Sequence, residues 1–290
     1  MFVNAVRDAM GNMPVSRWVW VLLAFAIGYA VLLTTQTMTL DLPNASSIAF
    51  STAPALVAAA LVYVAPRSRL IQIATIGFVA PLVVSAVRLV LAGDPLLWPG
   101  TPSNSYLAFA QSVRELTGAF SDVSFLFGLL AILALAVYIG RIGTRRGWLI
   151  VAGAALLAAV QAFSIASLAP PTELFPAHLV ALGMVAQLTL VAWGYLLAVT
   201  VERRHALLSI AAAITLINVA LSLLTVPLLQ YVGPIDPVTS IFMPPMLWVL
   251  WVVPWLTLIG GVLLELRRRT DSEEGTDRHL QPRPAGSASH

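Results

Sequence analysis

One arginine lies inside an apolar stretch of this 290-residue chain, where a guanidinium group is costly and therefore suggests a function. Arg88 lies about one helical turn from the end of an apolar run that ends near residue 92. There it can bind an anion or a substrate carboxylate, and Asp94 or Asp122 can pair with it. The competing explanation is structural, because a long side chain at this depth reaches the headgroups at little cost. We retain Arg88 and Asp122 as candidate ligand-binding residues.

Uncharged polar side chains form a second group that could do chemistry. They lie within apolar stretches and comprise Gln72, Gln161, His178, Gln187, Asn218 and Gln230. Such side chains commonly join membrane helices through hydrogen bonds of about 0.6 kcal/mol, and this is the favoured structural explanation. They can also line a solute site where a helix is broken, and prolines at 54, 81, 227 and 254 could break helices. His178, Gln187 and Asn218 are the ones we retain as ligand-binding candidates.

The residue types present exclude several kinds of catalysis. Cysteine is absent, which removes disulfides, thiolate zinc sites, iron–sulfur clusters and cysteine nucleophiles. The H-E-x-x-H, G-x-S-x-G, phosphate-loop and dinucleotide-binding patterns are also missing. Met38, Met243, Met246 and His178 carry atoms that suit Cu(I), but methionine equally fills gaps in packing. We predict no catalytic residue, no metal site and no cofactor, so an intramembrane enzyme is the least favoured class.

Composition identifies the environment in which these residues must work. Apolar residues make up 59% of the chain, charged residues 10%, and the mean hydropathy is +0.89. Soluble domains carry roughly 25% charged residues, so a water-soluble fold is excluded. The formal net charge is +3, and the arginines fall in pairs and triplets between apolar runs. That distribution is typical of membrane topology and gives no reason to expect nucleic-acid binding.

Eight apolar stretches are each long enough to cross a hydrocarbon core as a helix, which takes about 20 residues. They are residues 17–35, 48–65, 70–92, 122–140, 148–168, 177–200, 206–231 and 246–266. The predicted fold class is therefore an all-α polytopic integral membrane protein with eight transmembrane helices. The sequence places the protein in a cell membrane, with the lipid bilayer as its first partner.

Arginine distribution predicts the orientation of these helices. Every second connection carries arginine: Arg67 and Arg69, then Arg141, Arg145 and Arg146, then Arg203 and Arg204, then Arg267, Arg268 and Arg269. Arg7 and Arg17 precede the first stretch, whereas the intervening connections are net acidic. By the positive-inside rule, both termini are cytoplasmic.

Three further segments complete the predicted organisation. Residues 1–16 form a cytoplasmic amino-terminal segment, and residues 17–269 form the membrane domain. Residues 103–120 repeat apolar side chains at a spacing of three and four, which predicts an amphipathic helix on the outer face. Residues 270–290 lack apolar periodicity and are predicted to be a disordered cytoplasmic tail.

The chain also shows signs of an internal duplication. Residues 17–146 and 147–269 each contain a tryptophan-led helix after arginine, an acidic proline-bearing outer loop, and an Asp-Pro step after the third helix. Each copy would hold an even number of spans, so the two copies would be parallel, related by an axis along the membrane normal. Turns favour Asp and Pro everywhere, which is the competing explanation.

Two functions are favoured over an intramembrane enzyme at this stage. The favoured one is a non-enzymatic membrane protein that binds or translocates a small lipophilic or weakly anionic solute. The alternative is an accessory or sensory subunit that docks against other membrane subunits. A polar path containing Arg88, Gln187 and Asn218 would favour the first, whereas scattered polar pairs and an exposed face of small residues would favour the second.

Overall fold

The computed structural model describes residues 15–37, 45–92, 104–168, 177–232 and 252–267, and within them there is no strand. The predicted tail 270–290 and most of the amino-terminal segment 1–16 lie outside the described residues. The helices are α2 (Val15–Thr37), α3 (Ala45–Val64), α4 (Arg69–Ala92), α5 (Asn104–Asp122), α6 (Phe125–Ile139), α7 (Arg145–Leu168), α8 (Ala177–Ala186), α9 (Leu188–Glu202) and α10 (Ala206–Val232). A final helix (Val252–Leu266) ends in a π-helical turn, η1 (Val262–Leu266).

The all-helical class is confirmed for this part of the chain, and so is its suitability for a membrane. Four segments are long and apolar enough to cross: Arg17–Thr34, Arg69–Leu91, Arg145–Ser167 and Val180–Glu202. Four shorter apolar helices occupy the remaining predicted stretches: Ser51–Val64, Phe125–Ile139, Ala206–Leu221 and Val252–Leu266. A described apolar helix therefore lies at each of the stretches that the sequence marks.

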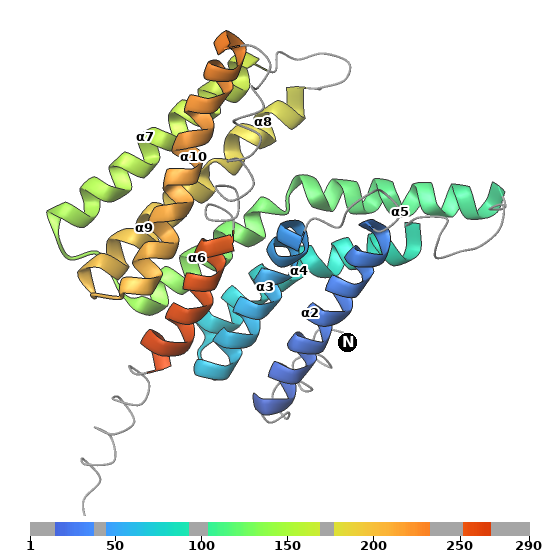
Figure 1. The fold of residues 1–290 in the computed structure, drawn as a ribbon, viewed down its shortest axis with the longest axis horizontal. Coiled ribbons are helices and arrows are strands. Elements are labelled where there is room, and N and C mark those ends of the chain that lie inside the picture. Colours follow the sequence, from blue (N-terminus) through green and yellow to red (C-terminus); the bar gives the residue numbers. More distant parts are fainter. Residues whose placement is uncertain (1–14, 38–44, 93–103, 169–176, 233–251, 268–290) are drawn as a thin grey trace, which may run out of the picture.

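The helices pack as a chain of neighbours, shown in Figure 1. α2 packs on α3, α3 on α4 and α4 on α6; α6 then packs on α9, which lies between α7 and α10. One buried cluster contains residues from both halves of the chain, among them Leu61, Ile71, Leu135, Leu196 and Leu208. This main core joins the two halves of the chain, and a second, smaller cluster between α2, α3 and α4 contains Ala26, Tyr29, Ala55 and Leu82.

Small residues allow the closest helix approaches. A Cβ on Gly77 of α4 would lie 2.5 Å from the carbonyl oxygen of Phe127 on α6. A Cβ on Gly194 of α9 would collide with the Cβ of Ala154 on α7. Helices in lipid associate through such close packing, because burial from water does not drive them together there.

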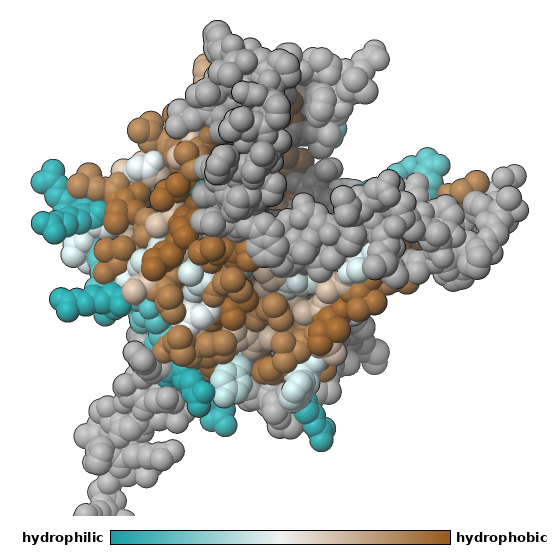
Figure 2. Space-filling model, viewed as in Figure 1, coloured by the Kyte–Doolittle hydropathy of each residue, from teal (hydrophilic) through white to brown (hydrophobic). Residues whose placement is uncertain are grey.

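The outer surface is apolar over a broad band, shown in Figure 2. Trp20 is 71% exposed, Leu156 67% and Phe163 73%. Exposure of this extent is rare on a soluble monomer, where large apolar patches mark interaction surfaces. Hydrophilic side chains of the described residues gather mainly along one edge of the band in Figure 2. This is the distribution expected of helices that face lipid.

Helix α5 crosses the direction of the other helices near one end of α2 and α4 (Figure 1). It packs on α4 and buries Ala110 and Thr117, while Phe109 and Leu116 stay exposed. The sequence predicts that the next span begins at residue 122, but α5 continues to Asp122 and α6 begins at Phe125. The helix turns at Val123 instead, where successive backbone bonds reach back three residues: Val123 to Phe120, and Leu126 to Val123.

The sixth predicted span, residues 177–200, is not one continuous helix. It is interrupted at Gln187, between α8 and α9. Here the backbone N–H of Gln187 donates to Met184 (3.2 Å), and the side-chain amide of Gln187 donates to the carbonyl of Gly183 (3.0 Å). A side chain that donates a hydrogen bond to a backbone carbonyl competes with the regular backbone hydrogen bonds of the helix. Pro54 and Pro81, which the sequence suggests as breakers, lie instead inside the uninterrupted helices α3 and α4.

Candidate functional site

The arginine-bearing turns meet at one end of the bundle, which we call the arginine end. It comprises the α3–α4, α6–α7 and α9–α10 turns together with the end of the final helix (Figure 1). Its arginines are all exposed: Arg67, Arg69, Arg141, Arg145, Arg146, Arg203, Arg204 and Arg267. Arg267 donates to the hydroxyl of Tyr63 (3.3 Å), which ties the final helix to the end of α3.

Glu202 joins two of these turns. It ends α9, and its carboxylate accepts hydrogen bonds from the backbone N–H groups of Gly143 (2.8 Å) and Thr144 (3.1 Å), just before α7. The Thr144 hydroxyl donates to the same carboxylate and also accepts from the N–H of Gly147 (3.1 Å). A carboxylate at a helix amino terminus satisfies backbone donors that have no partner within the helix, and it interacts favourably with the helix dipole.

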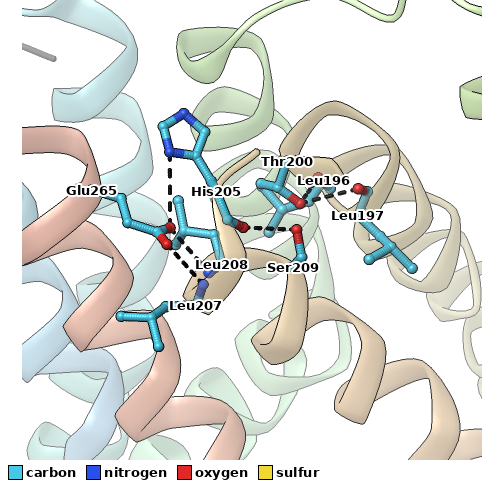
Figure 3. Close-up of polar contacts among 8 residues, drawn as sticks. All are labelled: Leu196, Leu197, Thr200, His205, Leu207, Leu208, Ser209 and Glu265. Atoms are coloured by element: carbon cyan, nitrogen blue, oxygen red, sulfur yellow. Dashed lines mark hydrogen bonds and ion pairs between the residues drawn. The ribbon is translucent and has the colours of Figure 1, made fainter. Parts of the chain in front are cut away.

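Glu265 makes the equivalent contact at the start of α10, shown in Figure 3. Its two carboxylate oxygens accept from the N–H groups of Leu207 (2.8 Å) and Leu208 (3.3 Å). His205 Nδ1 lies 3.8 Å from the same carboxylate, and the His205 carbonyl accepts from the Ser209 hydroxyl (2.7 Å). Glu265 therefore fastens the final helix to the first turn of α10.

The two carboxylate contacts, which we call clamps, match in sequence separation. The bond from Thr144 to Glu202 and the bond from Leu207 to Glu265 both span 58 residues. In each clamp the backbone donors lie at or just before the start of one helix, beside an arginine pair, and the glutamate lies near the end of a later helix: α7 and α9 in the first clamp, α10 and the final helix in the second. Because the donors include backbone N–H groups of another segment, these contacts fasten helix ends together.

A second polar region lies in the half of the bundle away from the arginine end. Gly194 meets Ala154, and a Cβ on Gly183 would lie 3.6 Å from Ile165 Cγ2, so these two pairs set the antiparallel register of α7 against α8 and α9. In that register Gln161 of α7 lies level with Gln187, at the helix interruption. Gln161 and Gln187, on neighbouring helices, thus lie at the same depth as the helix interruption.

Two polar atoms in this region have no hydrogen-bond partner. The side-chain oxygen of Gln161 and the hydroxyl oxygen of Thr189 are both buried and unpartnered among the described residues. A buried polar group left without a partner costs about 1 to 3 kcal/mol. Such groups are uncommon in native proteins, and each needs an explanation, such as a bound molecule.

Asn218 lies at a similar depth on α10. The α9–α10 turn is at Arg203 and Arg204, and Thr189 and Asn218 lie at nearly equal distances along the chain from that turn. α9 and α10 pack on each other, and the Asn218 side chain is half-buried. We call Gln161, Gln187, Thr189 and Asn218 the polar layer. At this similar depth it contains Gln187 and Asn218, two of the residues that the sequence marks as ligand-binding candidates.

The remaining candidates are placed apart from the polar layer. Arg88 is exposed near the end of α4, whose neighbours are α3, α5 and α6. His178 is exposed in the first turn of α8. Asp122 ends α5, and its side chain lies outside the described part of the structure, so its pairing with Arg88 stays a prediction. Of the three residues in the predicted polar path, Gln187 and Asn218 lie at a similar depth in the polar layer, whereas Arg88 lies on α4.

Sequence reasoning missed three polar residues that the structure brings forward. Glu202 and Glu265 count in the sequence only as charges within cytoplasmic connections, and Thr189 was not singled out. A signal for the glutamates was present, because a carboxylate in the last turn of a helix is repelled by that helix's own dipole and needs a donor elsewhere. No such signal marks Thr189, because threonines in membrane helices usually donate to their own backbone, as Thr200 and Thr215 do.

Comparison with known proteins adds no relative. A scan against protein-family models, a search of curated proteins and a search of solved structures each found no match to this chain.

Proposed function

We propose that the chain is a multi-pass membrane protein with eight spans and both termini in the cytoplasm. The support is a described apolar helix at each predicted stretch, with the arginine-bearing turns gathered at one end. Reporter fusions after residues 68, 144, 204 and 270 should then read as cytoplasmic, and fusions after 42, 100, 173 and 236 as external. Opposite readings at 144 and 204 would rule out the eight-span arrangement.

We further propose that the protein binds or translocates a small lipophilic or weakly anionic solute at the polar layer. The observation that carries this proposal is the pair of buried, unpartnered oxygens of Gln161 and Thr189 beside the break at Gln187. Helix interruptions in many transporters lie at the solute site. Here the Gly183 carbonyl beside the interruption accepts the Gln187 side chain, so the groups left for a solute are the side-chain oxygens of Gln161 and Thr189. A Gln oxygen accepts a hydrogen bond and a Thr hydroxyl can donate one, so a mainly apolar solute with one or two polar groups fits this layer.

The test measures solute retained by the purified full chain. Native mass spectrometry of protein extracted in mild detergent should detect a bound small molecule, and Gln161→Leu combined with Thr189→Val should lose it. The matched control is Gln72→Leu combined with Thr215→Val, because Gln72 is exposed and Thr215 already donates to the carbonyl of Ala211. Equal retention by both double variants would refute a solute site in the polar layer.

A second function is supported by the exposed face of α7. Small residues Ala152, Gly153, Ala155 and Ala159 are exposed there beside Leu156 and Phe163. Small residues let another membrane helix approach closely, so this face suits an accessory or sensory subunit of a larger complex. Under that function, a membrane partner co-purifies with the chain and is lost on Ala152→Leu with Ala155→Leu, while solute retention is unchanged.

A further inference from the structure

The α6–α7 and α9–α10 turns form one continuous basic surface. Glu202 bonds the two turns together through Gly143 and Thr144. A Cβ on Gly140 would lie 2.9 Å from Nε of Arg203, so the guanidinium of one turn rests directly against the backbone of the other. The exposed arginines on this joined surface are Arg141, Arg145, Arg146, Arg203 and Arg204.

Within the part of the chain that the structure describes, few acidic side chains balance the charge of this surface. Glu202 is the carboxylate that bridges the turns, and it lies close enough to Arg203 to interact with its charge. In the described residues, the ion pair recorded at this end joins His205 to Glu265, which belongs to the other clamp. Arg141, Arg145, Arg146 and Arg204 therefore form no ion pair with a carboxylate of the described segments.

Apolar side chains follow the arginines along the outside of α7. Trp148 is 58% exposed and Leu149 is 63% exposed. They lie three residues after Arg145 and Arg146, and side chains at this spacing are neighbours on one helix face. The outside of α7 therefore carries a guanidinium at its end, an indole or leucine one turn further in, and an apolar face beyond.

We propose that this surface binds the phosphate headgroup of an anionic phospholipid whose acyl chains lie along α7. Guanidinium forks suit phosphate oxygens, and basic groups between membrane helices on the cytoplasmic side recognise anionic headgroups. The exposed indole fits the headgroup level, where amphipathic rings are favoured. The clamp keeps both arginine groups together before lipid arrives. The proposal requires α7 to lie in a bilayer, but it is independent of a solute in the polar layer.

The test titrates the purified full chain in detergent with phosphatidylglycerol and, separately, with phosphatidylcholine, and counts bound lipid by native mass spectrometry. The parent should bind phosphatidylglycerol more tightly. Arg145→Gln with Arg146→Gln should weaken that binding about tenfold or more, since each arginine near an anionic surface contributes substantially to affinity. The matched control, Arg67→Gln with Arg69→Gln, removes two exposed arginines from the α3–α4 turn, which lies outside the joined surface, and should weaken binding clearly less.

Three outcomes would overturn the proposal. Equal losses in the two double variants would show attraction to overall charge, and no loss in either would show that these arginines do not bind lipid. Competition by millimolar inorganic phosphate would show a site for a free anion. Trp148→Ala keeps every arginine and should weaken phosphatidylglycerol binding without changing the response to inorganic phosphate. Thermal unfolding of each variant checks that the exposed substitutions leave the fold intact, and solute retention at the polar layer should not change.

Discussion

The arginine end and the polar layer differ in whether their buried or bridging oxygens have hydrogen-bond partners. At the arginine end, Glu202 accepts two backbone N–H groups from the α6–α7 turn, and Glu265 accepts two from the first turn of α10. In the polar layer, the oxygens of Gln161 and Thr189 are buried and have no hydrogen-bond partner among the residues that the structure describes. The first region uses its polar groups to hold helices together, whereas the second leaves polar groups available within an apolar bundle.

This difference separates stability from function within one molecule. A satisfied carboxylate between helices is explained by the bonds that it makes. An unsatisfied buried oxygen lowers stability, and its persistence suggests a role that packing does not supply. Removing the satisfied glutamates and removing the unpartnered oxygens should therefore act in opposite directions on stability, and the following predictions test that expectation.

The largest effect is expected at the Glu265 clamp. Glu265→Ala removes the acceptor of both the Leu207 and Leu208 N–H groups, and leaving buried donors unpartnered costs about 1 to 3 kcal/mol. Thermal or denaturant unfolding in detergent measures the loss. Glu265→Gln keeps one acceptor oxygen and should lose less. Glu115→Ala is the surface control, since its partner is the exposed Gln111. Equal stability of Glu265→Ala and Glu115→Ala would show that the clamp does not hold the helices.

Alanine substitutions at two glycines test how tightly the helices pack in each region. A Cβ on Gly261, beside the Glu265 clamp, would lie 2.7 Å from the Leu208 side chain and 3.1 Å from its backbone nitrogen. Gly261→Ala should therefore cost about 1 to 3 kcal/mol through overpacking. Gly183→Ala places its Cβ 3.6 Å from Ile165, an ordinary contact, and should be neutral or stabilising by up to about 1 kcal/mol. Unfolding curves of both variants decide the comparison, and a destabilised Gly183→Ala beside an unaffected Gly261→Ala would reverse it.

Removing an unpartnered oxygen from the polar layer should not weaken the protein. Gln161→Leu replaces the amide with an apolar group of similar size, so the solute-free protein should keep its stability or gain about 1 kcal/mol. Gln187→Leu is the contrasting variant, because it removes the bond to the Gly183 carbonyl. Unfolding midpoints after solute has been stripped provide the measurement. A clear loss on Gln161→Leu would mean that its oxygen is satisfied in the solute-free protein, and the contrast between the regions would disappear.

The smallest effect is expected at Arg88, which is exposed on α4 and belongs to neither region. Arg88→Lys should change stability by less than about 0.5 kcal/mol, because exposed substitutions away from buried networks are nearly neutral. Arg88→Leu should behave similarly if the guanidinium only reaches the headgroups. A loss of about 3 to 5 kcal/mol on Arg88→Leu, relieved by Asp122→Asn, would instead reveal a buried pair. Loss of bound solute on Arg88→Lys would add Arg88 to the solute site.

Part of the candidate site was predictable from the chain and part was not. Gln187 and Asn218 stand out in the sequence because uncharged polar residues are rare in apolar stretches. The interruption at Gln187 was not predictable from proline, because Pro54 and Pro81 leave their helices continuous. Gln161 lies at the same depth as Gln187 because Gly194 packs against Ala154. That register exists only once the two helices have packed together.

The sequence by itself determined the helical class, the positions of the apolar helices and the connections that carry arginine. These features are local, because span length and charge depend only on consecutive residues. The tertiary structure alone decided which backbone groups Glu202 and Glu265 bind, and which polar oxygens are buried without a partner. Those outcomes depend on contacts between residues far apart in the chain, and small residues at the helix interfaces set how closely and in which register the helices meet.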